Sequence, residues 1–350
     1  MRDLALLPKA HLHLHFTGSM RVATLADLAV KHGLRLPAAL TDGLALRLPS
    51  DERGWFRFQR LYDIARACVR DEEDMRRIVL EAAADDAAEG SRRLEIQIDP
   101  TSYAPFVGGI TPAIEIVLDA AREASQVTGT QVGVIVASSR VRHPLEARTL
   151  ARLAARYAGD GVGRVVGFGL SNDERRGETS EFAPAFRIAR DAGLAAVPHG
   201  GELLGADHVK VVVDELHPDR IGHGVRAVED PRVLELLVER GIALEVCPAS
   251  NVSLGVYHGA EDVPLRTLVA AGARIALGAD DPLLFACRLT AQYEAARTVH
   301  GFDDDGLADL ARASVRASRA SASSQAAWLA EIDGWLAGPV DRSPEPPTSR

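Results

Sequence analysis

The chain has 350 residues, of which 47% are hydrophobic and 25% charged, and its formal net charge is −9. This composition is typical of a globular enzyme, and the acidic balance argues against nucleic acid as a partner, because a phosphate-binding surface is usually basic. Without a long apolar run or room for a signal peptide before the first strand, and with only three distant cysteines, the sequence predicts a cytoplasmic protein that has no membrane span.

Short apolar runs alternate with longer stretches of helical period along most of the chain. Eight runs are predicted as strands: residues 10–16, 94–99, 132–137, 165–170, 194–198, 220–222, 243–247 and 274–277. The intervening helical stretches include residues 73–88, 112–124, 144–157 and 181–191. Such alternation indicates parallel βαβ units, and at this length it favours a closed barrel. The alternative is an open doubly wound sheet, but no G-x-G-x-x-G loop follows Phe16. We therefore predict an α/β protein, a (β/α)8 TIM barrel, with residues 1–337 as a single domain.

Two segments do not follow the alternation. Residues 22–68 separate the first two strands, which predicts a helical insertion. This insertion concentrates aromatic residues around Trp55 and Phe58, in a chain that is only 5% aromatic. It is either a helix packed on the barrel or a lid over the substrate, and both alternatives remain open. Residues 338–350 are rich in proline and polar side chains, so they are predicted to be a disordered tail.

The first predicted strand places histidine at every second position, at His11, His13 and His15. Residues two apart on a strand point to the same face, so the three imidazoles are expected to form one row. Neutral imidazole is a good ligand for zinc, which makes this row a candidate metal site. An edge strand with solvated histidines would give the same pattern.

Polar residues also gather where later predicted strands end. His199 and Glu202 follow the fifth strand, His223 the sixth, and Asp280 and Asp281 the eighth. Each residue alone has a structural explanation, as a core histidine, a helix-terminal carboxylate or a cap. Their occurrence together favours function, because the carboxyl ends of the strands form the active-site face of a barrel enzyme.

These residues together match the needs of a hydrolytic metal site. Three imidazoles and one carboxylate suit one zinc ion per chain, and the expected ligands are His13, His15, His199 and Asp280. Glu202, three residues beyond a ligand, is expected to be a general acid/base. His223 is expected to accept a hydrogen bond or a proton from the attacking water, and Asp281 to face the substrate.

The same motifs resemble those of the adenosine deaminases of the amidohydrolase superfamily, in the same order and over nearly the whole chain. They are His13-Leu14-His15, His199-Gly200-Gly201-Glu202, Gly222-His223-Gly224, Cys247-Pro248-Ala249-Ser250-Asn251 and Asp280-Asp281-Pro282. The resemblance implies a one-zinc barrel that deaminates a 6-aminopurine by hydrolysis. Glu202 would then deliver a proton to purine N1, His223 would orient or deprotonate the water, and Asp281 would contact N7.

Two departures from that family bear on the substrate. Adenosine deaminases usually carry aspartate where Thr17 stands, near the ribose 5′-hydroxyl, and glycine where Asn172 stands, near purine N3. Losing the carboxylate removes a hydrogen bond of about 1.5–3 kcal/mol to a 5′-hydroxyl. The substrate-binding residues are accordingly expected to be Asp281, Asn172, Thr17, Gly169, Trp55 and Phe58.

A 5′-modified adenine nucleoside fits these departures. Among substrates of the family, 6-amino-6-deoxyfutalosine of menaquinone biosynthesis carries an aryl carboxylate at that end. Arg57, Arg60 or Arg140 is a candidate cation for the carboxylate, and Trp55 or Phe58 a surface for the ring. The expected partner is thus a small-molecule purine nucleoside. Adenosine itself, hydrolysis of an ester or amide, and a non-catalytic purine-binding protein are the alternatives.

Overall fold

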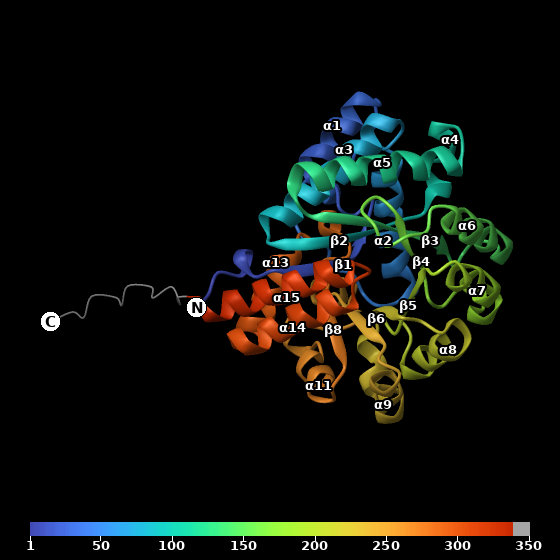
Figure 1. Cartoon of the computed structure of the whole chain (residues 1–350). Helices are drawn as coiled ribbons and strands as arrows, with labels where there is room; N and C mark the ends of the chain where they lie inside the picture. The colour runs from blue at the N-terminus through green and yellow to red at the C-terminus, as the bar shows by residue number, and fades with distance from the viewer. Residues whose placement is uncertain (339–350) are drawn as a thin grey trace.

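The computed structural model describes residues 1–338, and its centre is a barrel of eight parallel strands (Figure 1). Neighbouring strands pair in chain order from first to last. They are β1 (Lys9–His15), β2 (Ser91–Ile98), β3 (Gln131–Ser139), β4 (Val165–Ser171), β5 (Ala195–Gly200), β6 (Arg220–His223), β7 (Ala243–Val246) and β8 (Arg274–Leu277). The backbone of Asp280 closes the ring, because its N–H donates to His13 O and its carbonyl accepts from His15 N, both at 3.0 Å.

Helices surround the barrel and cover its ends. Those between the first strand and the fifth are α1 (Val22–Lys31), α2 (Glu52–Arg66), α3 (Glu72–Ala88), α4 (Ala104–Val107), α5 (Ile110–Thr128), α6 (Pro144–Arg156) and α7 (Ala183–Asp191). The later ones are α8 (Ala206–Leu216), α9 (Pro231–Glu239), α10 (Pro248–Ser253), α11 (Leu265–Ala270), α12 (Pro282–Phe285), α13 (Leu289–Thr298), α14 (Asp304–Ala317) and α15 (Ala322–Ala337). Short 3-10 turns fill several connections.

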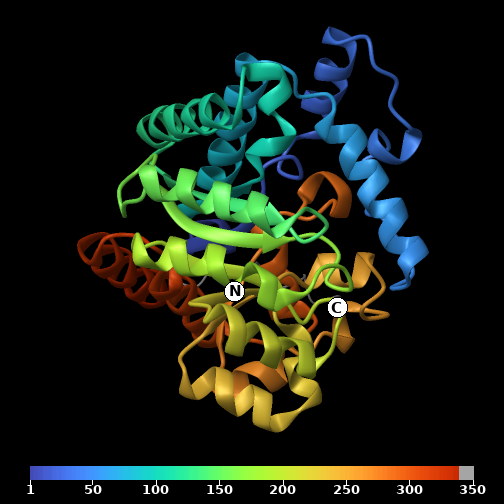
Figure 2. The ribbon, with the colours of Figure 1, turned by 90° about the vertical axis from the view of Figure 1, so that its right-hand side faces the viewer.

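The predicted TIM barrel is confirmed, and each predicted strand overlaps an observed one. The strands are detectable in the sequence because they are buried on both faces, so they appear as nearly continuous apolar runs. The helical insertion is also confirmed as α1 and α2. Figure 2 shows α2, in light blue, as a long helix set apart from the other helices at one edge of the molecule. The predicted tail lies outside the described residues from position 339 onward.

The first strand departs from the predicted row of three histidines. Between His11 and Leu14, β1 advances three residues while β2 advances only two, which is the register of a β-bulge. The extra residue reverses the alternation, so His11 faces the helices, where its Nδ1 lies 2.9 Å from Asp86 of α3. The prediction of one row was therefore wrong for His11. The family motif pairs only His13 and His15 and leaves His11 with a structural role, and the contacts of His11 agree with that interpretation. Its Nε2 accepts a hydrogen bond from Ala279 N at 3.0 Å, close to the closure of the barrel.

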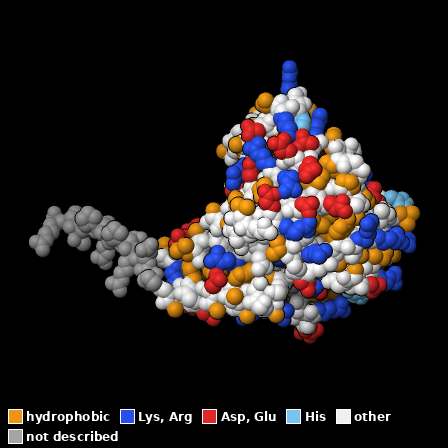
Figure 3. Space-filling model, turned by 45° about the horizontal axis from the view of Figure 1, so that its top comes forward, with side chains coloured by type: hydrophobic (Ala, Val, Ile, Leu, Met, Phe, Trp, Pro, Cys, Tyr) orange, Lys and Arg blue, Asp and Glu red, His pale blue; other side chains and the backbone are white. Residues whose placement is uncertain are grey.

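The helices and the surface have two further features. Among the described residues, the helices are too short or too polar to cross a membrane. Acidic and basic side chains are interspersed over most of the face drawn in Figure 3.

Candidate active site

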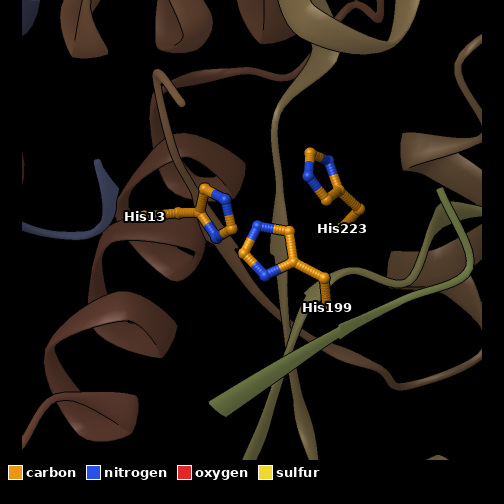
Figure 4. A group of neighbouring side chains, drawn as sticks. All are labelled: His13, His199 and His223. Carbon is orange, nitrogen blue, oxygen red and sulfur yellow. The ribbon is translucent and has the colours of Figure 1, made fainter. Parts of the chain in front are cut away.

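Four predicted metal ligands converge at the carboxyl ends of their strands. His13 and His15 come from β1, His199 from β5, and Asp280 follows β8. His15 Nε2 lies 3.2 Å from His199 Nε2 and 3.1 Å from Asp280 Oδ1, which is itself 3.4 Å from His13 Nε2. Figure 4 shows the rings of His13 and His199 turned toward each other, with His223 beside them.

These donors fit a transition metal. The nitrogens of His13, His199 and His223 lie within 4.8 Å of one another, as do the donor atoms of His13, His15 and Asp280. Within the described part of the chain, His13 Nε2 is buried and has no hydrogen-bond partner. Burying several imidazoles around one carboxylate is costly unless they bind a common cation. Histidine nitrogen and carboxylate oxygen are both ligands that zinc accepts.

A chain of buried charges fixes the orientation of His13 from inside the barrel. Its Nδ1 lies 2.8 Å from Glu245 of β7, and Glu245 accepts a 2.6 Å hydrogen bond from Arg220 of β6. Arg220 also donates to Glu95 of β2 at 2.7 Å. A carboxylate behind a metal-binding imidazole sets its tautomer and leaves Nε2 facing the metal. Glu245 lies on the seventh predicted strand, two residues before Cys247, but nothing in the sequence assigned it this role.

Glu202 and His223 face each other beside the ligands, with 3.6 Å between Oε1 and Nε2. Burial raises the pKa of Glu202 well above its ordinary value, and the charge of Asp280 adds to this effect. Burial lowers the pKa of His223 to about 4. The carboxyl therefore keeps its proton to a higher pH than an ordinary glutamate, while the imidazole stays neutral down to about pH 4, so one group can give a proton and the other can take one.

Glu174 holds the loop that carries Glu202. This role of Glu174 was not predicted from the sequence. Its carboxylate accepts hydrogen bonds from the backbone N–H of Glu202, Leu203 and Leu204 at 2.9–3.1 Å. Burial opposes the charge of Glu174, but the nearby His208, 3.6 Å away, the charge of Arg140 and the amide of Leu204 prevail and lower its pKa to about 2. A fixed anion thus positions the acid/base residue.

Asp281 begins the short helix α12 and packs against the turn after β1. A Cβ built on Gly18 would lie 1.7 Å from Asp281 Oδ1, so only glycine leaves room for this carboxyl. Burial raises the pKa of Asp281 well above its ordinary value, and the neighbouring Asp280 raises it further. A protonated Asp281 can donate a hydrogen bond to a ring nitrogen of a substrate.

Several site residues have a left-handed backbone that is unusual outside glycine. The φ angles are 80° at Asn172, 65° at His223 and 61° at Asp280. Such conformations cost energy and cluster at functional sites, where the surrounding structure imposes them. Asparagine tolerates this region better than most residues, which explains how Asn172 can occupy a position that favours glycine.

One cavity of about 390 Å³ connects the cluster to the solvent. His15, His199, Glu202, His223, Asp280 and Asp281 line its inner part. Trp55, Phe58 and Tyr62 of α2 line another wall, and Asn172 lies on the rim after β4. The cavity therefore joins the predicted metal site to the aromatic insertion, as expected for a pocket that holds an aromatic ring.

Not every residue predicted to bind substrate reaches this cavity. Thr17 is fully buried and hydrogen bonds to the hydroxyl of Tyr103, which does line the cavity. Gly169 lies beneath the side chain of Gln97, where a Cβ would come 3.4 Å from Gln97 Cδ. Both residues therefore shape the pocket through a neighbour instead of lining it.

The arginines predicted to face the solvent end of the substrate lie elsewhere. Arg57 and Arg60 are exposed on α2 but do not line the cavity. Arg140 is buried and donates to the backbone carbonyl of His199 at 2.7 Å, so it supports a ligand strand and is not a free cation. The rim instead carries Arg142 and Arg176, from the loops after β3 and β4.

Comparison with known proteins gives this site a family. The sequence model described as adenosine deaminase matches residues 8–335. The chain belongs to the adenosine deaminase family. It is a hydrolase that deaminates an adenine-containing substrate. A Streptomyces virginiae protein with the provisional name adenosine/adenine deaminase is 63% identical over 96% of this chain and 99% of its own.

Solved structures of other deaminases and amidohydrolases share the barrel of this deaminase. The adenine deaminase of Arthrobacter aurescens is 29% identical with a TM-score of 0.86, and the match covers 95% of this chain and 99% of that one. An amidohydrolase of Burkhoderia ambifaria, solved with bound Zn, is 26% identical with a TM-score of 0.83. That match covers 95% of this chain and 93% of the other.

Proposed function

We propose that this deaminase converts a 6-aminopurine nucleoside into the 6-oxo compound and ammonia, using one zinc ion per chain. The observation that carries the proposal is the convergence of a set of potential metal ligands with a buried carboxyl and a buried imidazole, 3.6 Å apart, in one cavity. His13, His15, His199 and Asp280 would hold the ion. Zinc in such a set acts as a Lewis acid that makes water nucleophilic near neutral pH.

The side chains divide the proton transfers among themselves. Glu202 donates a proton to N1, which withdraws electrons from C6 and opens it to attack. Neutral His223 accepts a proton from the attacking water. Its Nε2 lies 3.6 Å from Glu202 Oε1, so the proton that Glu202 gives to N1 can be replaced from His223. Protonated Asp281 donates a hydrogen bond to N7 and so fixes the rotation of the ring. The C6–N bond then breaks, and nitrogen leaves as ammonia with the second proton of water.

The outer part of the cavity supports a substituent on N9. Arg142 and Arg176 stand at the rim with their nearest carboxylates 3.6 and 4.0 Å away. A free purine would leave these cations and much of α2 uncontacted. We therefore place 6-amino-6-deoxyfutalosine first and adenosine second, with the anionic end of the former at the rim. This choice would assign the protein to menaquinone biosynthesis in the cytoplasm.

A substrate panel tests the proposal. Purified protein is given 6-amino-6-deoxyfutalosine, adenosine and adenine, and the loss of the 6-amino group is followed by purine absorbance. We expect kcat/KM to be largest for 6-amino-6-deoxyfutalosine. A value for adenosine or adenine larger by about tenfold, equivalent to about 1.4 kcal/mol in transition-state binding, contradicts this choice of substrate. Absence of ammonia with every purine would favour a non-catalytic purine-binding protein. Turnover of esters or amides, with none of the purines, would favour metal-dependent hydrolysis of such a compound.

A further inference from the structure

Gln97 is a buried polar side chain in the cavity with no role in the mechanism above. It comes from β2, is 3% exposed, and lines the same cavity as His15 and His199. Among the residues that the structure describes, neither Oε1 nor Nε2 of its amide has a hydrogen-bond partner. Leaving a buried acceptor unpaired costs about 1–3 kcal/mol, so a group in the cavity is needed to satisfy it.

Small residues on the neighbouring strands make room for this amide. A Cβ added to Gly169 of β4 would lie 3.4 Å from both Gln97 Cδ and the Cβ of Ala137 on β3. The side chain of Gln97 therefore extends from β2 across β3 to lie over β4. The metal-ligand set comes from the other side of the barrel, from β1, β5 and the end of β8.

The depth of Gln97 identifies the part of the substrate that it meets. Gln97 pairs with His15 in the register of β1 and β2, so the amide lies at the level of the ligands and below the rim where Arg142 and Arg176 stand. A purine whose C6 faces the ligands thus has its 6-substituent, and not its N9 substituent, at this level. In an N9-substituted 6-aminopurine, the 6-amino group is the one N–H donor of the ring system.

We infer that the Gln97 amide oxygen accepts a hydrogen bond from the 6-amino group and stays with it as it leaves, so that Gln97 selects substrates whose leaving group carries N–H. The inference rests on the proposed function and deepens it. In the step itself, water oxygen bonds to C6, the C6–N bond breaks, and its electron pair stays on nitrogen. Nitrogen takes one proton from the water to become ammonia, while the other water proton goes to His223 and replaces the proton that Glu202 gave to N1. Gln97 gives and takes no proton.

The test compares two leaving groups on the same purine. Adenosine loses ammonia, whereas 6-chloropurine riboside loses chloride, which has no N–H to offer. We expect Gln97→Met, which keeps the length of the side chain but not its amide, to lower kcat/KM for adenosine by about 10- to 100-fold and to leave the chloro compound within about threefold. Gln97→Ala serves as a second variant should the methionine pack poorly.

Ser139→Ala is the matched control. Ser139 Oγ also lines the cavity and is buried without a partner in the described structure, but Ser139 lies at the end of β3 toward the rim. We expect this variant to change both substrates equally. Equal loss on both substrates in the Gln97 variants would show a structural role only and overturn the inference. If wild-type protein released ammonia from none of 6-amino-6-deoxyfutalosine, adenosine and adenine, the proposed function itself would fail, so the two failures are distinguishable.

Discussion

Two neighbouring side chains, Glu202 and His223, acquire opposite protonation preferences from one buried environment. Loss of water disfavours the charged form of each, which raises the pKa of the carboxyl and lowers that of the imidazole to about 4. Asp280 reinforces the shift of Glu202 because like charges repel. The result is an acid and a base 3.6 Å apart, which is the arrangement that a proton-transfer reaction at neutral pH needs.

The pH dependence of kcat/KM follows from these two pKa shifts. Burial raises the pKa of Glu202, so this carboxyl keeps its proton to a higher pH than an ordinary glutamate and loses it as the pH rises further. His223 titrates near pH 4, so it becomes unable to accept a proton as the pH falls through about 4. We expect a profile that is flat around neutrality, with a loss on the alkaline side and another toward pH 4. A rate that rises steadily into alkaline solution would show that no protonated carboxyl is required.

Replacing Glu202 by glutamine removes the proton donor and keeps the shape of the side chain. General acid catalysis of this kind contributes about 100- to 10,000-fold, so kcat should fall within that range. Zinc content should stay unchanged because Glu202 is not among the proposed ligands. Glu178→Gln, at a carboxyl outside the cavity lining, is the control and should keep full activity. Full activity of Glu202→Gln would remove Glu202 from the mechanism.

At the scale of elements, the strand ends bring together side chains that are distant in sequence. The strands and their order could be predicted because doubly buried strands leave uninterrupted apolar runs, and the ligands because a barrel gathers the residues after each strand. The orientation of His11 could not be predicted, because a bulge depends on how β1 pairs with β2 and leaves no mark in the sequence. Gln97 was missed for a similar reason, since its environment comes from Ala137 and Gly169 on other strands.

The insertion helix α2 supplies the aromatic wall of the cavity, which gives its sequence a testable role. Trp55 packs on Phe58 with 5.1 Å between ring centroids, and both line the cavity. We expect Trp55→Ala to raise KM about 5- to 10-fold through lost aromatic contact, with a smaller change in kcat. Leu145→Ala, at an exposed position of α6 outside the cavity lining, is the control. An unchanged KM for Trp55→Ala would show that α2 packs on the barrel without contacting the substrate.

At the scale of the whole molecule, the proposed metal site would also contribute to the stability of the barrel. Its ligands join β1, β5 and the end of β8, so an ion bound there ties together segments that are far apart in the chain. The buried charges of Glu245, Arg220 and Glu95 extend this connection, because Arg220 also donates to the carbonyl of Ala317 at the end of α14 at 2.9 Å. Binding to the folded state alone stabilises it by mass action.

Zinc is therefore expected to raise the thermal midpoint of unfolding. At a free concentration about 100 times the Kd, the gain is about 2.7 kcal/mol, or about 4 °C for a chain of this size. His199→Ala should abolish the shift, whereas His258→Ala, at an exposed histidine outside the cavity, should keep it. Equal shifts in both variants would place the ion elsewhere.

A zinc titration of the metal-depleted protein, with ammonia release as the readout, tests the central claim of one metal serving one deamination site. We predict no ammonia from the metal-free protein, followed by a linear rise of the rate that stops at one zinc per chain. Full activity of the metal-free protein, or a rate that continues to rise until two ions are bound, would contradict the account.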